Sequence, residues 1–161
     1  MADSIKLTTV TNSIAAQSIT ITKPDGTSGA LTIRDIDELT EAINQEQCPI
    51  LTPRPNDFVT GFTVERDSFG ADAAYKTARY LLHYVLFYAP IAQGSTIFEK
   101  YDNMVTAAAV ILNHFATNTN LTGTTEFFPV TVENFGLVQD ATGTIFHGFP
   151  LTFSVMQFME T

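Results

Sequence analysis

The chain has 161 residues, 45% of them hydrophobic, and its 17 acidic residues outnumber its 8 basic residues to give a formal charge of −9. This length and hydrophobic content predict a single domain, residues 1–161, that buries about 70% of the surface its unfolded chain exposes. The acidic excess argues against a protein that holds nucleic acid through its phosphates. A lone cysteine, Cys48, excludes an intramolecular disulfide. The apolar runs are too short for a signal peptide or a membrane span, so we expect a soluble intracellular protein.

The first 33 residues predict a segment that precedes the main fold. Residues 4–17 are compatible with a short helix or with a flexible arm, because their Thr and Ser content opposes helix formation. Residues 18–22 and 30–33 alternate apolar and polar side chains around the turn sequence Pro24-Asp25-Gly26. This pattern predicts a hairpin.

The main fold, residues 34–161, is predicted to open with a helix. Asp35 or Asp37 can cap its start, and apolar side chains then recur at helical spacing to about Glu46. Three prolines between residues 49 and 55 follow. They predict an extended connection, since proline fixes its own φ and biases the preceding residue away from the α conformation.

A long strand and a long helix form the predicted centre of the fold. Even-numbered residues from 78 to 88 are all apolar, which is typical of a strand that lays one face on a core. Residues 58–66 are expected to pair with this strand as an antiparallel hairpin. The period then becomes helical over residues 96–117, and Thr96 with Glu99 has the spacing of a capping box.

Two further strands are predicted to close the sheet. The parity of the apolar residues changes near Asn134, which indicates a bulge. A turn over residues 139–143 leads into a last strand over 145–159, where Pro150 indicates an edge or bulge for part of the length. The order of elements predicts an α+β fold: a mainly antiparallel sheet of four or more strands, two main helices packed on one face, and an N-terminal hairpin or arm.

Catalytic chemistry is not evident in the sequence. The three histidines, His83, His114 and His147, lack the spacing of a zinc site, and no phosphate-binding loop, dinucleotide fingerprint or nucleophile elbow is present. We therefore expect no catalytic residue, metal or cofactor. The alternative is a small soluble enzyme whose site is assembled from these three histidines.

Several proline and aromatic patterns resemble a family of small proteins encoded among the tail genes of long-tailed, siphovirus-like phages, the tail-terminator or neck-type proteins. The resemblance covers residues 30–158 and is carried by the following segments: 48–58 (CPILTPRPNDF), 64–70 (VERDSFG), 84–90 (YVLFYAP), 134–136 (NFG) and 146–148 (FHG).

The resemblance implies a structural virion protein of the tail or neck, made in the host cytoplasm. Such a subunit assembles with itself as a ring, usually a hexamer, which caps the head-proximal end of the tail tube and meets the head-tail connector. DNA passes through the ring without specific binding. The family supplies no catalytic residues, and an adjacent neck or tail-tube ring protein is the alternative within this class.

The odd-numbered face of the long strand is the predicted oligomer interface. Its apolar residues are too many to leave in water as one patch, so we expect contacts between subunits there. The alternative is that residues 1–33 fold over this face within one subunit. The predicted interface residues are Arg79, Leu81, His83, Val85 and Phe87.

The acidic charge has a predicted place in such a ring. A channel wall that repels phosphates lets DNA slide, and no Lys or Arg follows Lys100. We therefore expect Glu126, Glu133 and Asp140 to line the channel. The alternative is that the charge only keeps the protein soluble before assembly.

Overall fold

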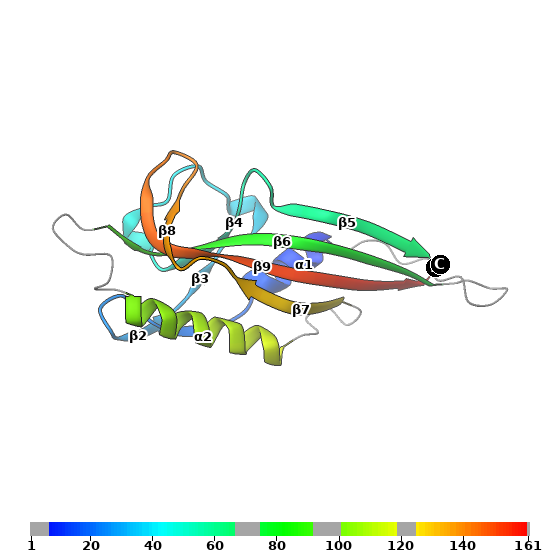
Figure 1. Cartoon of the computed structure of the whole chain (residues 1–161), viewed down its shortest axis with the longest axis horizontal. Helices are drawn as coiled ribbons and strands as arrows, with labels where there is room; N and C mark the ends of the chain where they lie inside the picture. Colours follow the sequence, from blue (N-terminus) through cyan, green and yellow to red (C-terminus); the bar gives the residue numbers. More distant parts are fainter. Residues whose placement is uncertain (1–6, 67–74, 92–100, 119–124, 161) are drawn as a thin grey trace.

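The computed structural model describes residues 7–66, 75–91, 101–118 and 125–160 and has an α+β fold with a mixed sheet of seven strands (Figure 1). The two α-helices are α1 (Leu7–Ala15) and α2 (Tyr101–Thr117). The strands of the sheet are β3 (Thr32–Ile33), β4 (Ile50–Pro53), β5 (Val59–Arg66), β6 (Tyr75–Pro90), β7 (Thr125–Val132), β8 (Gly136–Gln139) and β9 (Ile145–Glu160). No helix in these described ranges is long and apolar enough to cross a membrane.

The two longest strands, β6 and β9, form the centre of the sheet. Each has 16 residues, and they pair antiparallel along nearly their whole length. Strands β4 and β5 follow one another along the outer side of β6, and β7 and β8 do the same along β9. The sheet is mixed because β3 runs parallel to β4. This arrangement gives a long ribbon from which β5 and β7 form the outer strands at one end (Figure 1).

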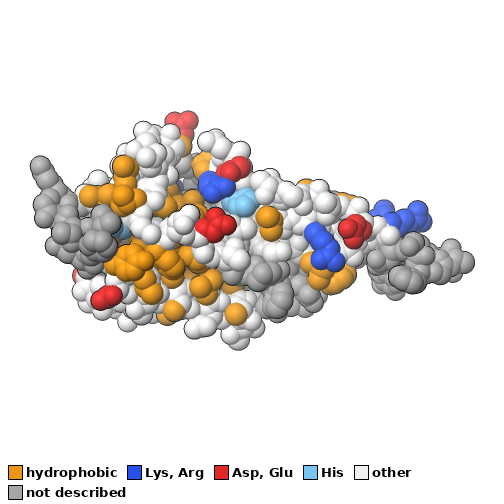
Figure 2. Space-filling view, viewed as in Figure 1, with side chains coloured by type: hydrophobic (Ala, Val, Ile, Leu, Met, Phe, Trp, Pro, Cys, Tyr) orange, Lys and Arg blue, Asp and Glu red, His pale blue; other side chains and the backbone are white. Residues whose placement is uncertain are grey.

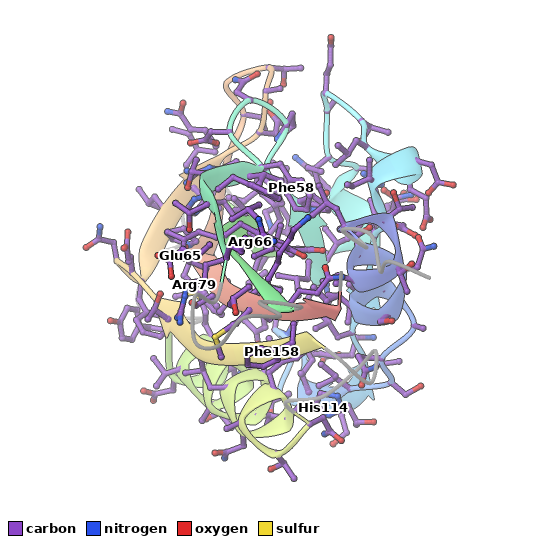
Figure 3. All side chains as sticks on the ribbon, turned by 90° about the vertical axis from the view of Figure 1, so that its right-hand side faces the viewer. Phe58, Glu65, Arg66, Arg79, His114 and Phe158 are labelled. Carbon is purple, nitrogen blue, oxygen red and sulfur yellow. The ribbon has the colours of Figure 1, made fainter. Side chains whose placement is uncertain are left out.

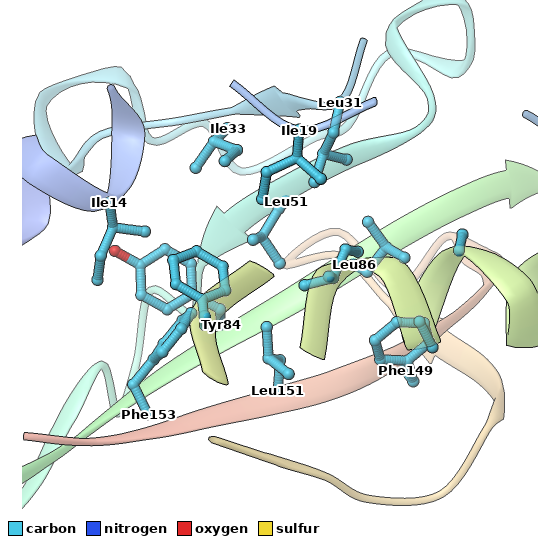
Figure 4. Packing of buried hydrophobic residues seen from close by; sticks show 14 of the residues in the cluster. Ile14, Ile19, Leu31, Ile33, Leu51, Tyr84, Leu86, Phe149, Leu151 and Phe153 are labelled. Atoms are coloured by element: carbon cyan, nitrogen blue, oxygen red, sulfur yellow. The ribbon is translucent and has the colours of Figure 1, made fainter. Parts of the chain in front are cut away.

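The main core lies on the even-numbered face of β6. Its side chains from Tyr80 to Tyr88 share one buried cluster with residues of β9 and of both helices. Tyr84 and Phe153 lie together in this core and meet edge to face, with ring centroids 5.1 Å apart (Figure 4). The Phe153 ring also meets that of Phe115 of α2, at a centroid distance of 4.8 Å. The predicted strand over residues 58–66 and its antiparallel pairing with β6 are confirmed.

The N-terminal residues belong to this core. Helix α1 buries Val10 and Ile14, and a separate two-stranded antiparallel sheet of β1 (Thr20–Thr22) and β2 (Ser28–Ala30) buries Ile21. The predicted hairpin is therefore present, but its second strand is residues 28–30 instead of 30–33, because residues 32–33 pair with β4. Among the two readings of residues 4–17, the described part is helical.

The predicted helix from Asp35 or Asp37 to Glu46 is wrong. Residues 36–38 and 45–47 form two short 3-10 turns instead, and the first is closed by a capping box between Asp35 and Glu38. A contact from far along the chain opposes a continuous helix, since the amide of Ile43 donates to the Asp140 carboxylate at 3.1 Å. The predicted capping box at Thr96 and Glu99 lies outside the described residues.

The region of the expected bulge contains a break between two strands. Asn134 takes a φ of 45°, and both β7 and β8 pair with β9 on either side of it. The Pro150 carbonyl accepts from the Glu133 amide, so the backbone of Pro150 is directed toward the break between β7 and β8. The N–H that proline lacks would point the same way, and the pairing of β9 with β6 therefore loses no hydrogen bond. This agrees with the expectation of a local edge at Pro150.

Candidate assembly surface

The five residues of the predicted interface lie in three different environments along β6. At one end, Val85 and Phe87 are only 7% and 4% exposed. They belong to a second buried cluster with Ile43, Ile50 and Phe146, in which the rings of Phe87 and Phe146 meet at 5.2 Å. The expectation that these two side chains form an exposed patch is therefore wrong, because their own subunit covers them.

The covering segment differs from the one the sequence suggested. Residues 7–33 lie in the main cluster on the opposite face, whereas residues 43–50 contribute the cover over Val85. Side-chain hydrogen bonds hold this segment, since Arg34 donates to Thr40 at 2.6 Å and to Gln47 at 2.5 Å. Ile43 and Ile50, near the two ends of this segment, share the buried cluster with Val85 and Phe87.

Asp140 ties this cover to the turn that precedes β9. One carboxylate oxygen accepts from the Ile43 amide, and the other accepts from the Thr142 amide, the Thr142 hydroxyl and the Thr144 amide, at 2.6–3.1 Å. Burial by itself would raise the pKa of Asp140, but these hydrogen bonds outweigh it and lower the pKa below its ordinary value. The carboxylate thus has a structural task within the subunit, and its place in a channel wall stays a prediction.

The other end of the odd face is open to solvent. Leu81 is 37% exposed, and Arg79 is also exposed, between Thr63 of β5 and Met156 of β9 in the strand register. Figure 3 looks onto this end of the sheet and shows Arg79 and Glu65 at its margin. These two interface candidates therefore remain available to a neighbouring subunit.

His83 lies between the covered and the open half. Its Nε2 is 2.6 Å from the Thr60 hydroxyl and its Nδ1 is 3.1 Å from the Thr152 hydroxyl, so the ring links β5, β6 and β9. Burial and then the positive charge of Arg54 lower the pKa of His83, while the acidic groups of Asp57 and Glu133 act in the opposite direction. This environment favours a neutral imidazole held by two hydroxyl groups.

Charged side chains surround the histidine on the surface. Arg54 forms an ion pair with Asp57, in which Nε donates to the carboxylate at 2.5 Å. This pairing lowers the pKa of Asp57, chiefly through the hydrogen bond from Arg54. Figure 2 shows acidic, basic and histidine side chains gathered near the middle of this face. The middle of this face therefore carries charges of both signs.

The two remaining channel candidates lie on or beside β7. Glu133 is exposed just after β7 ends. Glu126 lies within β7 in register with Met156 of β9, and its side chain is outside the described part of the structure. The three predicted acids are thus spread along the β7–β8 side of β9, and their orientation toward a channel stays a prediction.

The other histidines and the cysteine make contacts within the subunit. His114 of α2 lies 2.8 Å from the Gln17 side-chain oxygen, and His147 is buried in β9. Burial raises the pKa of Cys48 to about 11, which suits a thiol that packs as a small apolar group. Among the described residues, no three His, Cys, Asp or Glu side chains are grouped so that they could hold a metal ion.

Sequence reasoning missed the exposed apolar residues of β5. The predicted strand over residues 58–66 carries Phe62 and Val64, and these two side chains are 42% and 48% exposed. Phe62 stacks on Tyr80 at 5.1 Å, so one face of its ring rests on the core and the other faces outward. The charged residues Glu65 and Arg66 next to them were the available signal, because they indicate the outer strand of a sheet.

Comparison of the chain with protein-family models, with curated proteins and with solved structures found no match. The resemblance to phage tail proteins therefore rests on the sequence patterns alone.

Proposed function

We propose that this protein is a structural component of a phage tail that forms a ring at the head-proximal end of the tail tube and joins it to the head-tail connector. The observation that carries the proposal is the resemblance of residues 30–158 to tail-terminator proteins. The open end of the sheet supports it. There Leu81, Phe62 and Val64 expose apolar surface, at 37%, 42% and 48%.

The layered arrangement of the subunit suits a ring. We take the sheet as a mainly antiparallel layer with both helices on one face, since residues of α1 and α2 share the cluster on the even face of β6. Such a subunit has one face closed by its own helices. Contacts with neighbours then fall to the sheet edges and the open part of the odd face, where Arg79 and Leu81 lie.

The charge of the chain supports passage of DNA through the ring. At −9 per subunit, six copies would carry −54 in total, which is six times the formal charge of one chain. An acidic channel wall has no basic side chains to displace the counterions of DNA, so it would not bind the phosphates. Glu133 is an exposed acid that can take part in such a wall. An adjacent ring protein of the neck or tube would have the same properties.

Electron microscopy of the purified protein tests the proposal. We expect closed rings with a central hole, and a reconstruction should show more acidic than basic side chains along the hole. A channel lined by Lys and Arg would contradict the proposed path of DNA. A population of single subunits at tens of micromolar would contradict the ring itself.

A further inference from the structure

The sheet ends in two outer strands at the same end of the molecule, β5 on one side and β7 on the other (Figure 1). Both have eight residues. The cross-strand register connects residues of β5 through β6 and β9 to residues of β7. One such row contains Thr63, Arg79, Met156 and Glu126. Within the described residues, β5 pairs only with β6 and β7 only with β9.

The outer edge of β5 has no partner strand within the described part of the chain, so its backbone groups on that side are available. His83 turns both its N–H and its C=O to the β4–β5 side, where the partners are Phe58 and Arg54. Alternate strand residues turn the same way, so Arg79 also faces β5 and bonds with Thr63. Val64 therefore directs its N–H and C=O away from β6.

The same reasoning locates the free groups of β7. The Glu133 amide donates to the Pro150 carbonyl at 3.3 Å, so Glu133 turns toward β9. Its neighbour Val132 must turn the other way, toward the outer edge. Helix α2 does not replace a partner strand, because it packs on the face of the sheet through Phe115 and Phe153.

The two free edges are complementary in direction. Strands β5, β6, β9 and β7 are each antiparallel to the next, so β5 and β7 run in opposite directions. If copies are related by rotation about an axis roughly parallel to the strands, β7 of one copy meets β5 of the next as an antiparallel pair. A continuous sheet then forms without any change within the subunit.

The charges of the two sides are also complementary. Strand β5 carries Glu65 and Arg66, and the neighbouring end of β6 adds Lys76 and Arg79. Strand β7 carries one charged residue, Glu126, and no base. A β5–β7 contact therefore brings a basic side of one copy to an acidic strand of the next, whereas a β5–β5 contact would bring two basic sides together.

We propose that β5 of one copy pairs antiparallel with β7 of a second copy, and that this pairing closes the ring. The inference rests on the proposed function, and it names the two surfaces that meet. The pairing satisfies the outward groups of Val64 and Val132. It also covers the exposed apolar side chains of Phe62 and Val64.

Two proline variants test the pairing. Val64→Pro removes an outward N–H from β5 and Val132→Pro removes one from β7, while the bonds to β6 and β9 are kept. Val64→Ala and Val132→Ala are the matched controls, since they shorten the same side chains and keep the N–H. We expect both alanine variants to assemble and each proline variant alone to sediment as a single subunit.

Mixing the two proline variants identifies the interface. Each variant keeps the edge that the other lacks, so an equimolar mixture should give dimers, twice the mass of either component, and nothing larger. Proline variants that assemble as the wild type does, a mixture that stays monomeric, or dimers of Val132→Pro alone would overturn the β5–β7 pairing. A wild-type protein that never assembles would instead overturn the proposed function.

Hydrogen exchange supplies a second measurement should a proline variant fail to fold. In the wild-type assembly, the amides of Val64 and Val132 should exchange at least tenfold more slowly than in the dilute subunit. The amide of the exposed Leu137 on β8 should not change. Rings in which Val64 and Val132 exchange at the subunit rate would overturn the inference.

Discussion

At the scale of single residues, Val85 and Leu81 lie on the same side of β6 but in different environments. Val85 is buried against the cluster of Ile43 and Phe146, whereas Leu81 on the same side of the same strand is exposed. A carboxylate placed at Val85 would be buried without a partner. We therefore expect Val85→Asp to lower the free energy of unfolding by several kcal/mol, on the order of 3–5, and Leu81→Asp to change it by less than about 1.

Urea unfolding of the two variants at neutral pH measures this difference. A Val85→Asp subunit as stable as the wild type would show that residues 43–50 do not cover β6 as described.

His83 predicts a dependence of stability on pH. Its folded-state pKa lies below the ordinary value of 6.5 because the ring is partly buried. As pH falls below that ordinary value, the unfolded chain binds the proton before the folded chain does, so stability should decrease until pH passes the folded-state pKa. His83→Gln should lose less stability than the wild type between pH 7.5 and pH 5.

Thermal melting of both proteins across this range provides the measurement. Equal losses would mean that His83 does not titrate differently in the two states. The carboxyl groups of Asp57 and Asp140, whose pKa values are lowered, should affect stability only below about pH 5, outside the range compared.

At the scale of elements, Asp140 joins the cover over Val85 to the β8–β9 turn. Removing its carboxylate leaves the amides of Ile43, Thr142 and Thr144 without their acceptor. We expect Asp140→Ala to cost about 1–3 kcal/mol in the free energy of unfolding. The control Asp57→Ala removes an exposed ion pair and should cost less than about 1 kcal/mol. Urea unfolding that gave equal losses would contradict the structural role of Asp140.

The close approach of β6 and β9 near Leu86 depends on one glycine. A Cβ atom at Gly148 would lie 1.9 Å from the carbonyl oxygen of Leu86, in the part of the pair where the register shifts. Gly148→Ala must therefore push the two central strands apart. We expect a loss of about 2 kcal/mol or more, compared with about 1 for Gly26→Ala, where only positive φ opposes the side chain. Similar melting temperatures for the two variants would contradict this close approach.

The sequence predicts the long elements better than the connections between them. Alternation over residues 75–90 and helical spacing over residues 101–117 repeat many times, so these elements are recognisable without tertiary information. The helix expected over residues 35–46 fails because a hydrogen bond from Asp140, 97 positions from Ile43, holds the segment in another form. Local spacing contains no information on that contact.

The candidate surface was only partly predictable, because its exposure depends on contacts between distant parts of the chain. The period-two pattern identifies the odd face of β6 but not what covers it, so Val85 and Phe87 look like Leu81 in the sequence. The exposed side chains of β5 depend on β5 being an outer strand, and strand order is set by tertiary pairing.

At the scale of the whole molecule, the features form one account. Residues of both helices share the buried cluster on the even face of β6, and residues 43–50 pack beside Val85 on the odd face. Within the described residues, the outer strands β5 and β7 each pair with one strand only. In the proposed ring, a second copy would pair with these two edges. The account therefore requires self-assembly into a closed species of fixed size.

Native mass measurement of the purified protein across a hundredfold range of concentration tests this requirement most directly. The account predicts one predominant assembly at an integral multiple, six for the proposed hexamer, of the 17.6 kDa subunit. A species that remained at 17.6 kDa at every concentration, or an open series of ever larger assemblies without a preferred size, would contradict it.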